Sequence, residues 1–492
     1  MWFTSAQHAR YLMEKQCRYG IRFDVEYGKK LLSDIERMMA EIEAEVEPNL
    51  PKRKLKESEK SHYKFPKKCY NIDGSLSELM RKFSDKHGLE FGPDNTVIFN
   101  GVVVKIVGDT YLPMELPMKL GEGQDLKDWL ISRGWKPTLW NFKTDSRNKP
   151  IRGEDGKYIK TSPKIQDKGV ICPNLLELDG ELPVLVVRWF SLRNRGAVLR
   201  GWLDHPQLLV NERLPSGSSG ITPTHRQKHT VVANIPKAEE GVLLGKEFRS
   251  LFVAKGDKVL VGYDASALEA RVTGHYTYKY DGGEYGRELI EGDIHTKNSW
   301  VFYQAELERS GISFEGCRDN PKFKPFRSKS KNGAYCLSYG GSAAKLAETL
   351  GVATSKGKEL YDRYWEANWA LAKLKENVIE YWKKHGYLVG IDGRRLYGRS
   401  PHSLVNLLFQ SCGAIAMDYA NSFMDRWIEE KGIPATRVAV MHDESLWEVA
   451  PEHAEEVGRL GVASIVKAGE LLKLKVPLAA EWKCGRSWAE VH

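Results

Sequence analysis

The first 47 residues contain two runs of apolar positions at helical spacing. Gly20 and the dipeptide Phe23-Asp24 interrupt the runs, and both are typical of a turn. This pattern predicts two helices joined by a turn between Ser5 and Glu47. The apolar positions that recur are Ala9, Leu12, Met13, Leu31, Leu32, Ile35 and Met38.

Residues 51–68 carry eight Lys or Arg against two Glu, with a Pro near either end. The composition predicts a solvated, mobile segment, and a surface loop and a contact with a DNA backbone are equally favoured. Residues 69–165 mix short β-like runs, such as Thr96–Phe99, with one helix over Leu126–Arg133. No chemistry can be assigned there from the sequence.

Beyond residue 185 the pattern changes. A helix is predicted over Leu185–Arg195, and a loop rich in Gly, Ser and Pro over Pro215–Thr224. Val259–Val261 then reads as a buried strand that ends near Asp264. The pair Ser266 and Glu269 fits a capping box at the start of the next helix, which is a purely structural interpretation.

Residues 327–341 predict a helix with one distinctive face. Its positions at every fourth residue carry two cations and then two aromatic rings, and Gly340-Gly341 ends the helix. Cations at this spacing suit a triphosphate, and a ring suits the sugar or base of one nucleotide. A basic surface face is the structural alternative. The four positions are Arg327, Lys331, Tyr335 and Tyr339.

Residues 437–449 contain two β-like runs that flank His442-Asp443-Glu444. They predict a hairpin with acidic residues at its turn. Since Asp is common in turns for structural reasons, the triplet by itself does not establish a site.

Composition narrows the class of protein. The formal net charge of +9 favours polyanionic partners, and the 41% hydrophobic and 28% charged residues are ordinary for a globular chain of 492 residues. No apolar run could span a membrane and no signal peptide is evident, so no membrane partner and an intracellular, cytoplasmic location are expected. The seven cysteines show no CxxC pairing, which argues against a disulfide framework or a zinc site.

Together the three segments resemble motifs A, B and C of the family A DNA polymerases. The pattern DxSxxExR matches at Asp264, Ser266, Glu269 and Arg271, and HDE matches at 442–444. RxxxKxxxYxxxYG matches over residues 327–340. The resemblance implies a right-hand α+β fold: a helical thumb over 1–200 with an insertion at about 51–118, an antiparallel β-sheet palm over 201–284 and 391–492, and helical fingers over 285–390.

The resemblance also implies the role of each site residue. Two Mg²⁺ ions would be held by Asp264, Asp443 and the Ala265 carbonyl, and oxygen ligands with phosphates suit that ion. The expected catalytic residues are Asp264, Asp443, Lys331 and Arg327. Expected contacts to the deoxynucleoside triphosphate are Ser266, Glu269, His295, Arg327, Lys331, Tyr335 and Tyr339. Expected contacts to primer-template DNA are Asn234, Asn406, Gln410 and His442.

Further segments resemble the short-tailed-phage branch whose polymerase recruits thioredoxin, notably Gly292–Lys297 and Asn406–Ser411. No amino-terminal exonuclease motif is recognised, so no 3′–5′ exonuclease activity is expected from these residues. Either a separate chain supplies proofreading or the sequence is part of a longer chain. A processivity factor on residues 51–118 and a lineage-specific elaboration are equally favoured. One departure from the family pattern is Thr224 where an arginine is usual. Either Arg226 or His225 replaces that arginine, or this contact to primer-template DNA is lost, and the sequence does not decide between them.

Two other functions share some of these features. A single-subunit RNA polymerase has the same metals and cation-bearing helix, but Glu269 and the HDE triplet argue against it. A silent DNA-clamping subunit would have lost one of the two aspartates, and both are present.

Overall fold

The computed structural model describes residues 2–492 except 55, 100–101, 109, 113–114, 168–169 and 240. The chain divides into two compact units. Unit 1 comprises residues 1–29 and 201–492, and unit 2 comprises residues 30–200. The sequence placed residues 1–200 together as a thumb, whereas the unit boundaries lie near residues 30 and 200.

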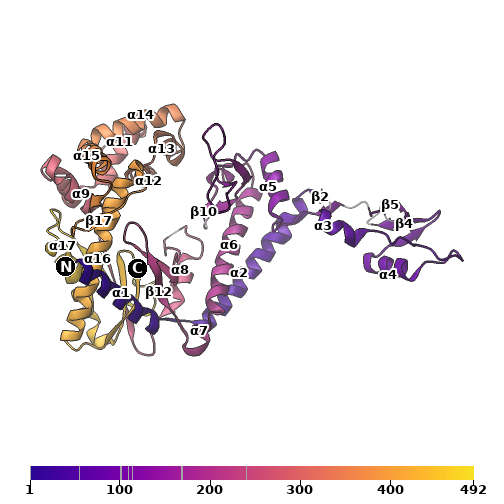
Figure 1. The fold of residues 1–492 in the computed structure, drawn as a ribbon, viewed down its shortest axis with the longest axis horizontal. Helices are drawn as coiled ribbons and strands as arrows, with labels where there is room; N and C mark the ends of the chain where they lie inside the picture. Colours follow the sequence, from indigo (N-terminus) through magenta and orange to yellow (C-terminus); the bar gives the residue numbers. More distant parts are fainter. Residues whose placement is uncertain are drawn as a thin grey trace. The chain divides into compact units, whose positions relative to one another are not determined.

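A four-stranded antiparallel sheet forms the centre of unit 1 (Figure 1), as predicted for the palm. Its strand order is β18-β19-β15-β20, so strands distant in sequence lie side by side. Every residue of β19 is buried, so the side chains on both faces of this strand are covered. The strands are β15 (Val259–Ala265), β18 (Ala435–Met441), β19 (Glu444–Val449) and β20 (Ala480–Gly485).

Helices α16 (Leu404–Glu430) and α17 (Ala454–Leu471) pack on each other, and α17 covers β15 and β20. A Cβ atom at Gly461 would lie 2.3 Å from the Tyr263 ring, so only glycine lets α17 approach β15 this closely. Helix α1 (Trp2–Tyr19) contacts α16 and β18. This contact places α1 in unit 1.

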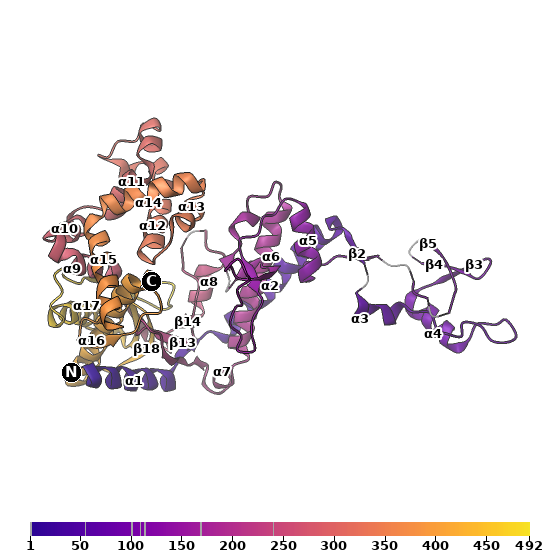
Figure 2. The same ribbon diagram turned by 45° about the horizontal axis from the view of Figure 1, so that its top comes forward.

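The segment predicted as fingers is helical. Helices α11, α12, α13 and α14 share a hydrophobic core that includes Phe302, Leu337, Leu346 and Tyr364. Figure 2 shows these helices grouped on one side of the sheet within unit 1. The helices are α9 (Leu268–Asp281), α10 (Glu284–Glu291), α11 (Ile294–Arg309), α12 (Lys324–Ser338), α13 (Ala343–Leu350), α14 (Thr354–Ala367) and α15 (Trp369–His385).

The predicted loop at 215–224 is wrong. Strand β12 (Ser216–Ile221) pairs with β13 (Gln227–Val231) in an antiparallel hairpin, because its small residues leave the backbone free to form ladder hydrogen bonds. The other short elements of unit 1 are β1 (Ile21–Phe23), α7 (Pro206–Asn211), β11 (Arg213–Leu214), α8 (Gly245–Ser250), β14 (Phe252–Val253), β16 (Leu388–Val389) and β17 (Arg395–Leu396).

Unit 2 contains most of α2 (Val25–Val46) and α6 (Leu182–Leu203). Trp189 of α6 donates its indole N–H to Glu43 of α2 at 2.9 Å, and Arg200 pairs with Glu36 at 2.6 Å. The predicted helices at both ends of this unit are therefore confirmed. Between them lie α5 (Gly123–Ser132), β7 (Trp140–Phe142), β8 (Lys160–Pro163), β9 (Gln166–Asp167) and β10 (Val170–Ile171).

Within unit 2, residues 63–112 have a small hydrophobic core of their own. Phe65, Met80, Val97 and Leu112 are among its buried members. The region is built from α4 (Glu78–His87), β3 (Glu90–Gly92), β4 (Thr96–Phe99) and β5 (Val102–Lys105). Strand β4 has the bounds that the β-like run predicted.

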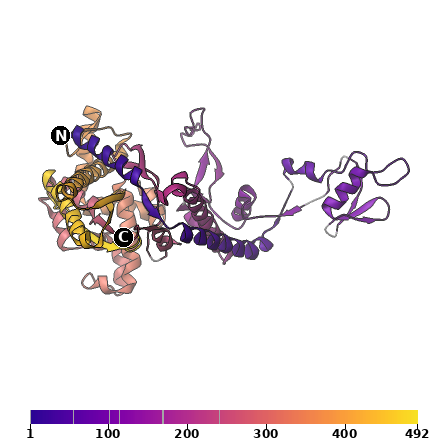
Figure 3. The same ribbon diagram turned by 90° about the horizontal axis from the view of Figure 1, so that it is seen from below.

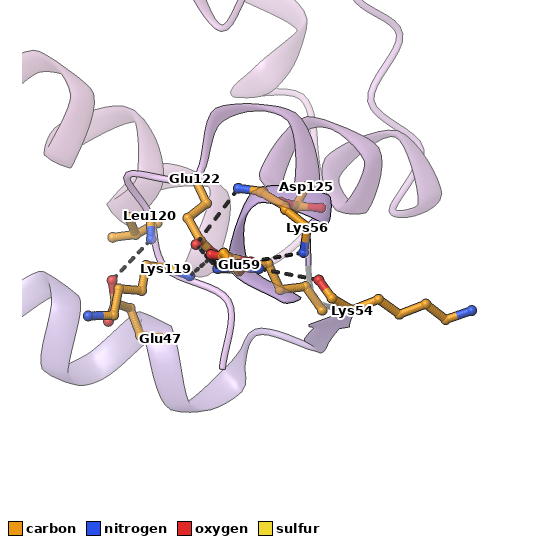
Figure 4. Close-up of polar contacts among 9 residues, drawn as sticks. Glu47, Lys54, Lys56, Glu59, Lys119, Leu120, Glu122 and Asp125 are labelled. Atoms are coloured by element: carbon orange, nitrogen blue, oxygen red, sulfur yellow. Dashed lines mark hydrogen bonds and ion pairs between the residues drawn. The ribbon is translucent and has the colours of Figure 1, made fainter. Parts of the chain in front are cut away.

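The mobile segment predicted at 51–68 contains regular structure instead. Strand β2 (Lys52–Lys54) pairs with β6 (Glu115–Pro117), and α3 spans Glu57–Lys60. Arg53 is buried and forms ion pairs with Glu59, at 2.8 Å, and with Glu122 (Figure 4). A buried arginine with two carboxylate partners anchors this segment, while most of its lysines stay exposed.

No helix among the described residues is long and apolar enough to cross a membrane. All seven cysteines are free thiols, and four of them, Cys69, Cys172, Cys317 and Cys412, are buried. The predicted absence of a disulfide framework is thus confirmed.

Candidate active site

Two strand ends bring the acidic residues of distant segments together. Asp264 lies at the end of β15 directly opposite Glu444 of β19. The Ala265 amide donates a hydrogen bond to the Asp443 carbonyl at 3.1 Å, which holds the β18–β19 turn beside β15. His442 adopts a left-handed backbone (φ 58°), as a two-residue hairpin turn requires. The predicted hairpin and its acidic turn are confirmed.

Among the described residues no ion pair involves Asp264 or Asp443, whereas Glu444 beside them is paired. Partial loss of hydration, followed by repulsion from the carboxylates of Asp443 and Glu444, raises the pKa of Asp264 to about 7. His492 acts in the opposite direction and does not cancel the effect. Carboxylates that repel one another in this way are suited to a divalent cation.

Glu444 differs from the two aspartates because it is buried and its carboxylate has partners within the protein. Its carboxylate accepts a hydrogen bond from the Trp488 indole at 2.6 Å, and lies 3.6 Å from Arg249 and 3.3 Å from His492 Nδ1. These contacts fasten the carboxyl-terminal segment to β19. The sequence did not identify Arg249, since nothing in its local pattern shows that it is buried.

The predicted capping box at Ser266 and Glu269 is wrong. Helix α9 begins after Ala267, which has a left-handed backbone (φ 51°) and provides no side-chain cap for the first turn. The Glu269 carboxylate instead accepts a hydrogen bond from the Tyr339 hydroxyl at 3.0 Å. Burial raises the pKa of Glu269, and the Tyr339 hydrogen bond and Arg226 oppose that change. Glu269 therefore links motif A to the helix of motif B.

The helix of motif B forms as predicted. Tyr335 and Tyr339 stack with centroids 6.2 Å apart and an interplanar angle of 15°. Lys331 is exposed, with its ammonium 6.0 Å from the Tyr335 centroid. Gly340 ends the helix with φ 83°, and a Cβ there would lie 2.0 Å from the His402 carbonyl oxygen. No other residue fits this helix end.

Asp293 is a site residue that sequence reasoning missed. Its carboxylate caps α11 by accepting from the His295 amide at 3.0 Å, and it also receives the Arg327 guanidinium at 2.8 and 3.2 Å. Burial would raise the pKa of Asp293, but hydrogen bonds from Arg327 and Thr296 lower it to about 2. An Asp immediately before a helix that contains His295 is a capping signal that could have revealed it.

His295 lies on the same side of this cluster. Its ring centroid is 6.0 Å from that of Tyr335, and its Nδ1 is buried without a hydrogen-bond partner among the described residues. Burial, Arg327 and Lys331 lower the pKa of His295, and Asp293 opposes them. These effects favour the neutral form of the ring.

The residues predicted to contact DNA come from three separate segments of the chain. Asn406 and Gln410 are one turn apart on α16, and the Asn406 Oδ1 is buried without a described partner. His442 packs edge-on against His229 with centroids 5.4 Å apart. Asn234 is exposed in a left-handed backbone conformation (φ 53°) after β13.

The hairpin turn at Thr222–Arg226 separates the two candidates for the missing arginine. His225 Nδ1 lies 3.2 Å from the Arg394 guanidinium, which is itself paired with Asp392 at 2.6 Å. Both side chains line a pocket together with His442 and Asp443. Arg226 is the one whose charge lowers the pKa of Glu269 and of His442, so it is the candidate that acts on the acidic sheet edge.

Comparisons with known proteins agree with this geometry. The model of DNA polymerase family A matches residues 224–490. A DNA-directed DNA polymerase of Escherichia phage Phieco32 is 26% identical, over 98% of this chain and 97% of that protein. The DNA-directed DNA polymerase of Enterobacteria phage T3 is 30% identical over 48% of this chain and 33% of its own length.

Among solved structures, the POL domain of Pol1 from M. smegmatis, in complex with DNA primer-template and dNTP, shares the fold. Its TM-score is 0.68 at 17% sequence identity, over 98% of this chain and 70% of that chain. The sheet that places Asp264 opposite Glu444 and the match of residues 224–490 to the family model lead to the same assignment. This chain belongs to DNA polymerase family A.

Proposed function

We propose that this chain is a template-directed DNA polymerase that adds deoxynucleotides to a primer 3′-hydroxyl. The observation that supports the proposal most strongly is that hydrogen bonds join three segments that are distant in the sequence. Asp264 and Asp443 share one sheet edge, and Glu269 beside them is hydrogen-bonded to Tyr339 of the cation-bearing helix. The relatives named above are DNA-directed DNA polymerases of phages.

The acidic edge fits two Mg²⁺ ions. Among the described residues no three His, Cys, Asp or Glu side chains converge into a ready metal site. Mg²⁺ commonly takes one or two carboxylates and completes its shell with water and substrate phosphates, so Asp264, Asp443 and the Ala265 carbonyl are a sufficient protein contribution. When bound, such ions activate the attacking hydroxyl and neutralise the leaving pyrophosphate.

The cations of α12 are suited to the triphosphate. Arg327 is held by Asp293, which fixes the direction of its guanidinium, while Lys331 one turn later is free in solvent. We assign Lys331 to protonation of the departing pyrophosphate, because its ammonium carries donors and no described carboxylate partner. His295 would complete the contact to the phosphates.

The sugar of the incoming nucleotide would lie against Tyr335 and Glu269. The position of Glu269, fixed by Tyr339, gives a steric reason for rejecting a ribose 2′-hydroxyl, and this distinguishes the chain from a single-subunit RNA polymerase. Ser266 lies between Ala265 and Glu269 and would contact the same nucleotide. Since relatives with Tyr at this helix position accept dideoxynucleotides, efficient use of chain terminators is expected.

For primer-template DNA we propose Arg226, His442, Asn406 and Gln410 as contacts. The orphaned Asn406 Oδ1 and the pocket shared by Arg226 and His442 support this set. Asn234 is also proposed as a DNA contact, and this assignment rests on the sequence resemblance alone. Sequence-independent contacts in the minor groove would use the acceptors that all base pairs present there.

Other parts of the proposal rest on the family resemblance. They are the thumb, palm and fingers boundaries, the thioredoxin-recruiting phage branch, a processivity factor on residues 51–118, and function in a host cytoplasm. We also propose that these 492 residues have no 3′–5′ exonuclease activity. Release of nucleotides from a labelled primer end by the purified chain, without pyrophosphate, would contradict it.

The decisive experiment is primer extension on a primed single-stranded template with Mg²⁺. Extension with four deoxynucleotides, but not with four ribonucleotides, would support both the activity and the role of Glu269. Addition of dideoxynucleotides to the same reaction tests the use of terminators, with Tyr335→Phe as the matched control. Tight binding of primer-template without any extension would instead favour the silent DNA-clamping alternative.

A further inference from the structure

Unit 2 contains a small β-structure that none of the site chemistry uses. Residues 140–163, here called the double-turn arm, begin with β7 and end with β8, which are paired. Isolated bridges join Thr144 to Pro150 and Arg152 to Tyr158, so the chain makes two tight turns in succession. Figure 3 shows this part of unit 2 standing away from helix α6.

The arm has no core to explain it. No residue from 141 to 161 is buried, and all of them are described. Nevertheless Phe142, Tyr158 and Ile159 are 38%, 43% and 37% exposed, and the Phe142 and Tyr158 rings lie 5.5 Å apart. An ordered surface that gathers aromatic side chains without burying them is typical of a binding site.

The charges of the arm are arranged for an anionic partner. It carries six Lys or Arg against three acids. Two of the acids serve the turns: Asp145 accepts amide hydrogen bonds from Arg147 and Lys149, and Asp155 accepts one from Lys157. None of the described ion pairs involves Lys143, Arg147, Lys149 or Lys157, and the nearest one along the chain joins Lys164 to Asp167.

Two cations of the arm also lie close to aromatic rings. The Lys160 ammonium lies 4.7 Å from the Trp140 ring centroid, and the Arg152 guanidinium lies 4.4 Å from that of Tyr158. Phosphates need only the cations, but unpaired bases also need ring faces on which to stack. We therefore propose that the double-turn arm binds single-stranded DNA, at a site separate from the nucleotide site.

The test is the affinity of the full chain for a labelled single-stranded oligonucleotide and for a blunt duplex, measured by fluorescence anisotropy over a salt series. A four-cation variant, K143Q/R147Q/K149Q/K157Q, should reduce the salt slope for single-stranded DNA by about 3, since each phosphate contact contributes about 0.7. The variant F142A/Y158A should bind single-stranded DNA roughly tenfold more weakly and leave duplex binding within about twofold.

A matched control removes the same charge elsewhere. K29Q/R37Q/R459Q/K467Q replaces four exposed cations that pair with carboxylates on their own helices, and its salt slope should change by less than half as much. Unchanged single-strand affinity in both arm variants would overturn the proposal. Equal loss on duplex and single strand in F142A/Y158A would overturn the preference for unpaired bases.

The outcome does not depend on polymerase activity. If the wild-type chain extends no primer, the anisotropy series still decides whether the arm binds DNA. If it extends primers, the four-cation variant should reach the wild-type rate at saturating primer-template, because the arm lies outside the catalytic residues.

Discussion

The two ends of one strand pair, β15 and β19, differ in how their acidic groups are partnered. At one end Glu448, opposite Leu260, is fully buried and satisfied. Arg213 donates to both of its oxygens at 2.9 and 3.0 Å, and the Tyr19 hydroxyl and the Lys255 amide donate to it as well. At the other end no ion pair among the described residues involves Asp264 or Asp443, and the pKa of Asp264 rises to about 7.

The difference teaches how to distinguish a structural acid from a functional one in the same sheet. The carboxylate of Glu448 ties α1 and β11 to the sheet, so its charge is used for stability. The charge at the Asp264 end is left for something that the chain does not itself supply. Perturbed acids without protein partners are candidates for chemistry, whereas paired acids are candidates for architecture.

The largest expected effect is on catalysis. Asp443→Asn should lower primer extension by about 10⁴-fold, because one of the two carboxylates proposed to hold the metal ions loses its charge. Folding should not suffer, since the change relieves repulsion with Asp264. The control Glu452→Gln alters an exposed carboxylate and should extend primers normally. Near-normal primer extension by Asp443→Asn would show that the acids at this end of the β15–β19 pair are not catalytic.

The next effect is on stability. Glu448→Gln should lower the free energy of unfolding by about 3 to 5 kcal/mol, because it leaves the buried Arg213 guanidinium without its partner. Urea denaturation would measure this. Glu212→Gln, which breaks an exposed pair with Arg22, should cost less than about 1 kcal/mol. A Glu448→Gln protein as stable as wild type would mean that this end is not structural.

A smaller effect is expected at Asp293, which combines both kinds of role. Asp293→Asn can still cap α11, but it loses the ionic hold on Arg327. Single-nucleotide incorporation should show about a tenfold lower kcat/KM, chiefly through a higher KM for the nucleotide. Asp319→Asn, an exposed neighbour, should leave KM unchanged. A change in thermal stability with an unaltered KM would limit Asp293 to capping.

The smallest effect is a pH dependence at Tyr19. Burial and the adjacent Glu448 carboxylate raise the pKa of Tyr19 to about 12, above its ordinary value near 10. The neutral phenol is therefore the form that stabilises the fold, fully so below pH 10, and this contribution is lost as pH rises from 10 to 12. Tyr19→Phe should be less stable than wild type by about 1 kcal/mol at pH 8, and the gap should narrow over that range.

Urea denaturation of both proteins at several pH values would measure that gap. Other tyrosines titrate equally in the two proteins and cancel in the difference. A gap that stays constant between pH 10 and 12 would show that Tyr19 does not sense Glu448.

Local pattern was enough to predict the elements of the site. Helix α12, strand β15 and the β18–β19 hairpin follow from periods of 3.6 and 2 residues and from a turn at His442-Asp443. The matched motifs then indicated the family and its chemistry. Local pattern was misleading at two places. The small residues at 215–224 predict a loop but form a strand, and Ser266 and Glu269 fit a capping box that does not form.

Tertiary structure alone decided which partner each side chain has. The sequence could not place Glu269 against Tyr339, Arg327 against Asp293 or Arg53 between Glu59 and Glu122. These pairs join residues that are distant along the chain, and packing rather than local propensity brings them within hydrogen-bond reach. The sequence by itself thus determined the elements and the class of chemistry, while the fold determined which acids remain unpaired and available to a metal ion.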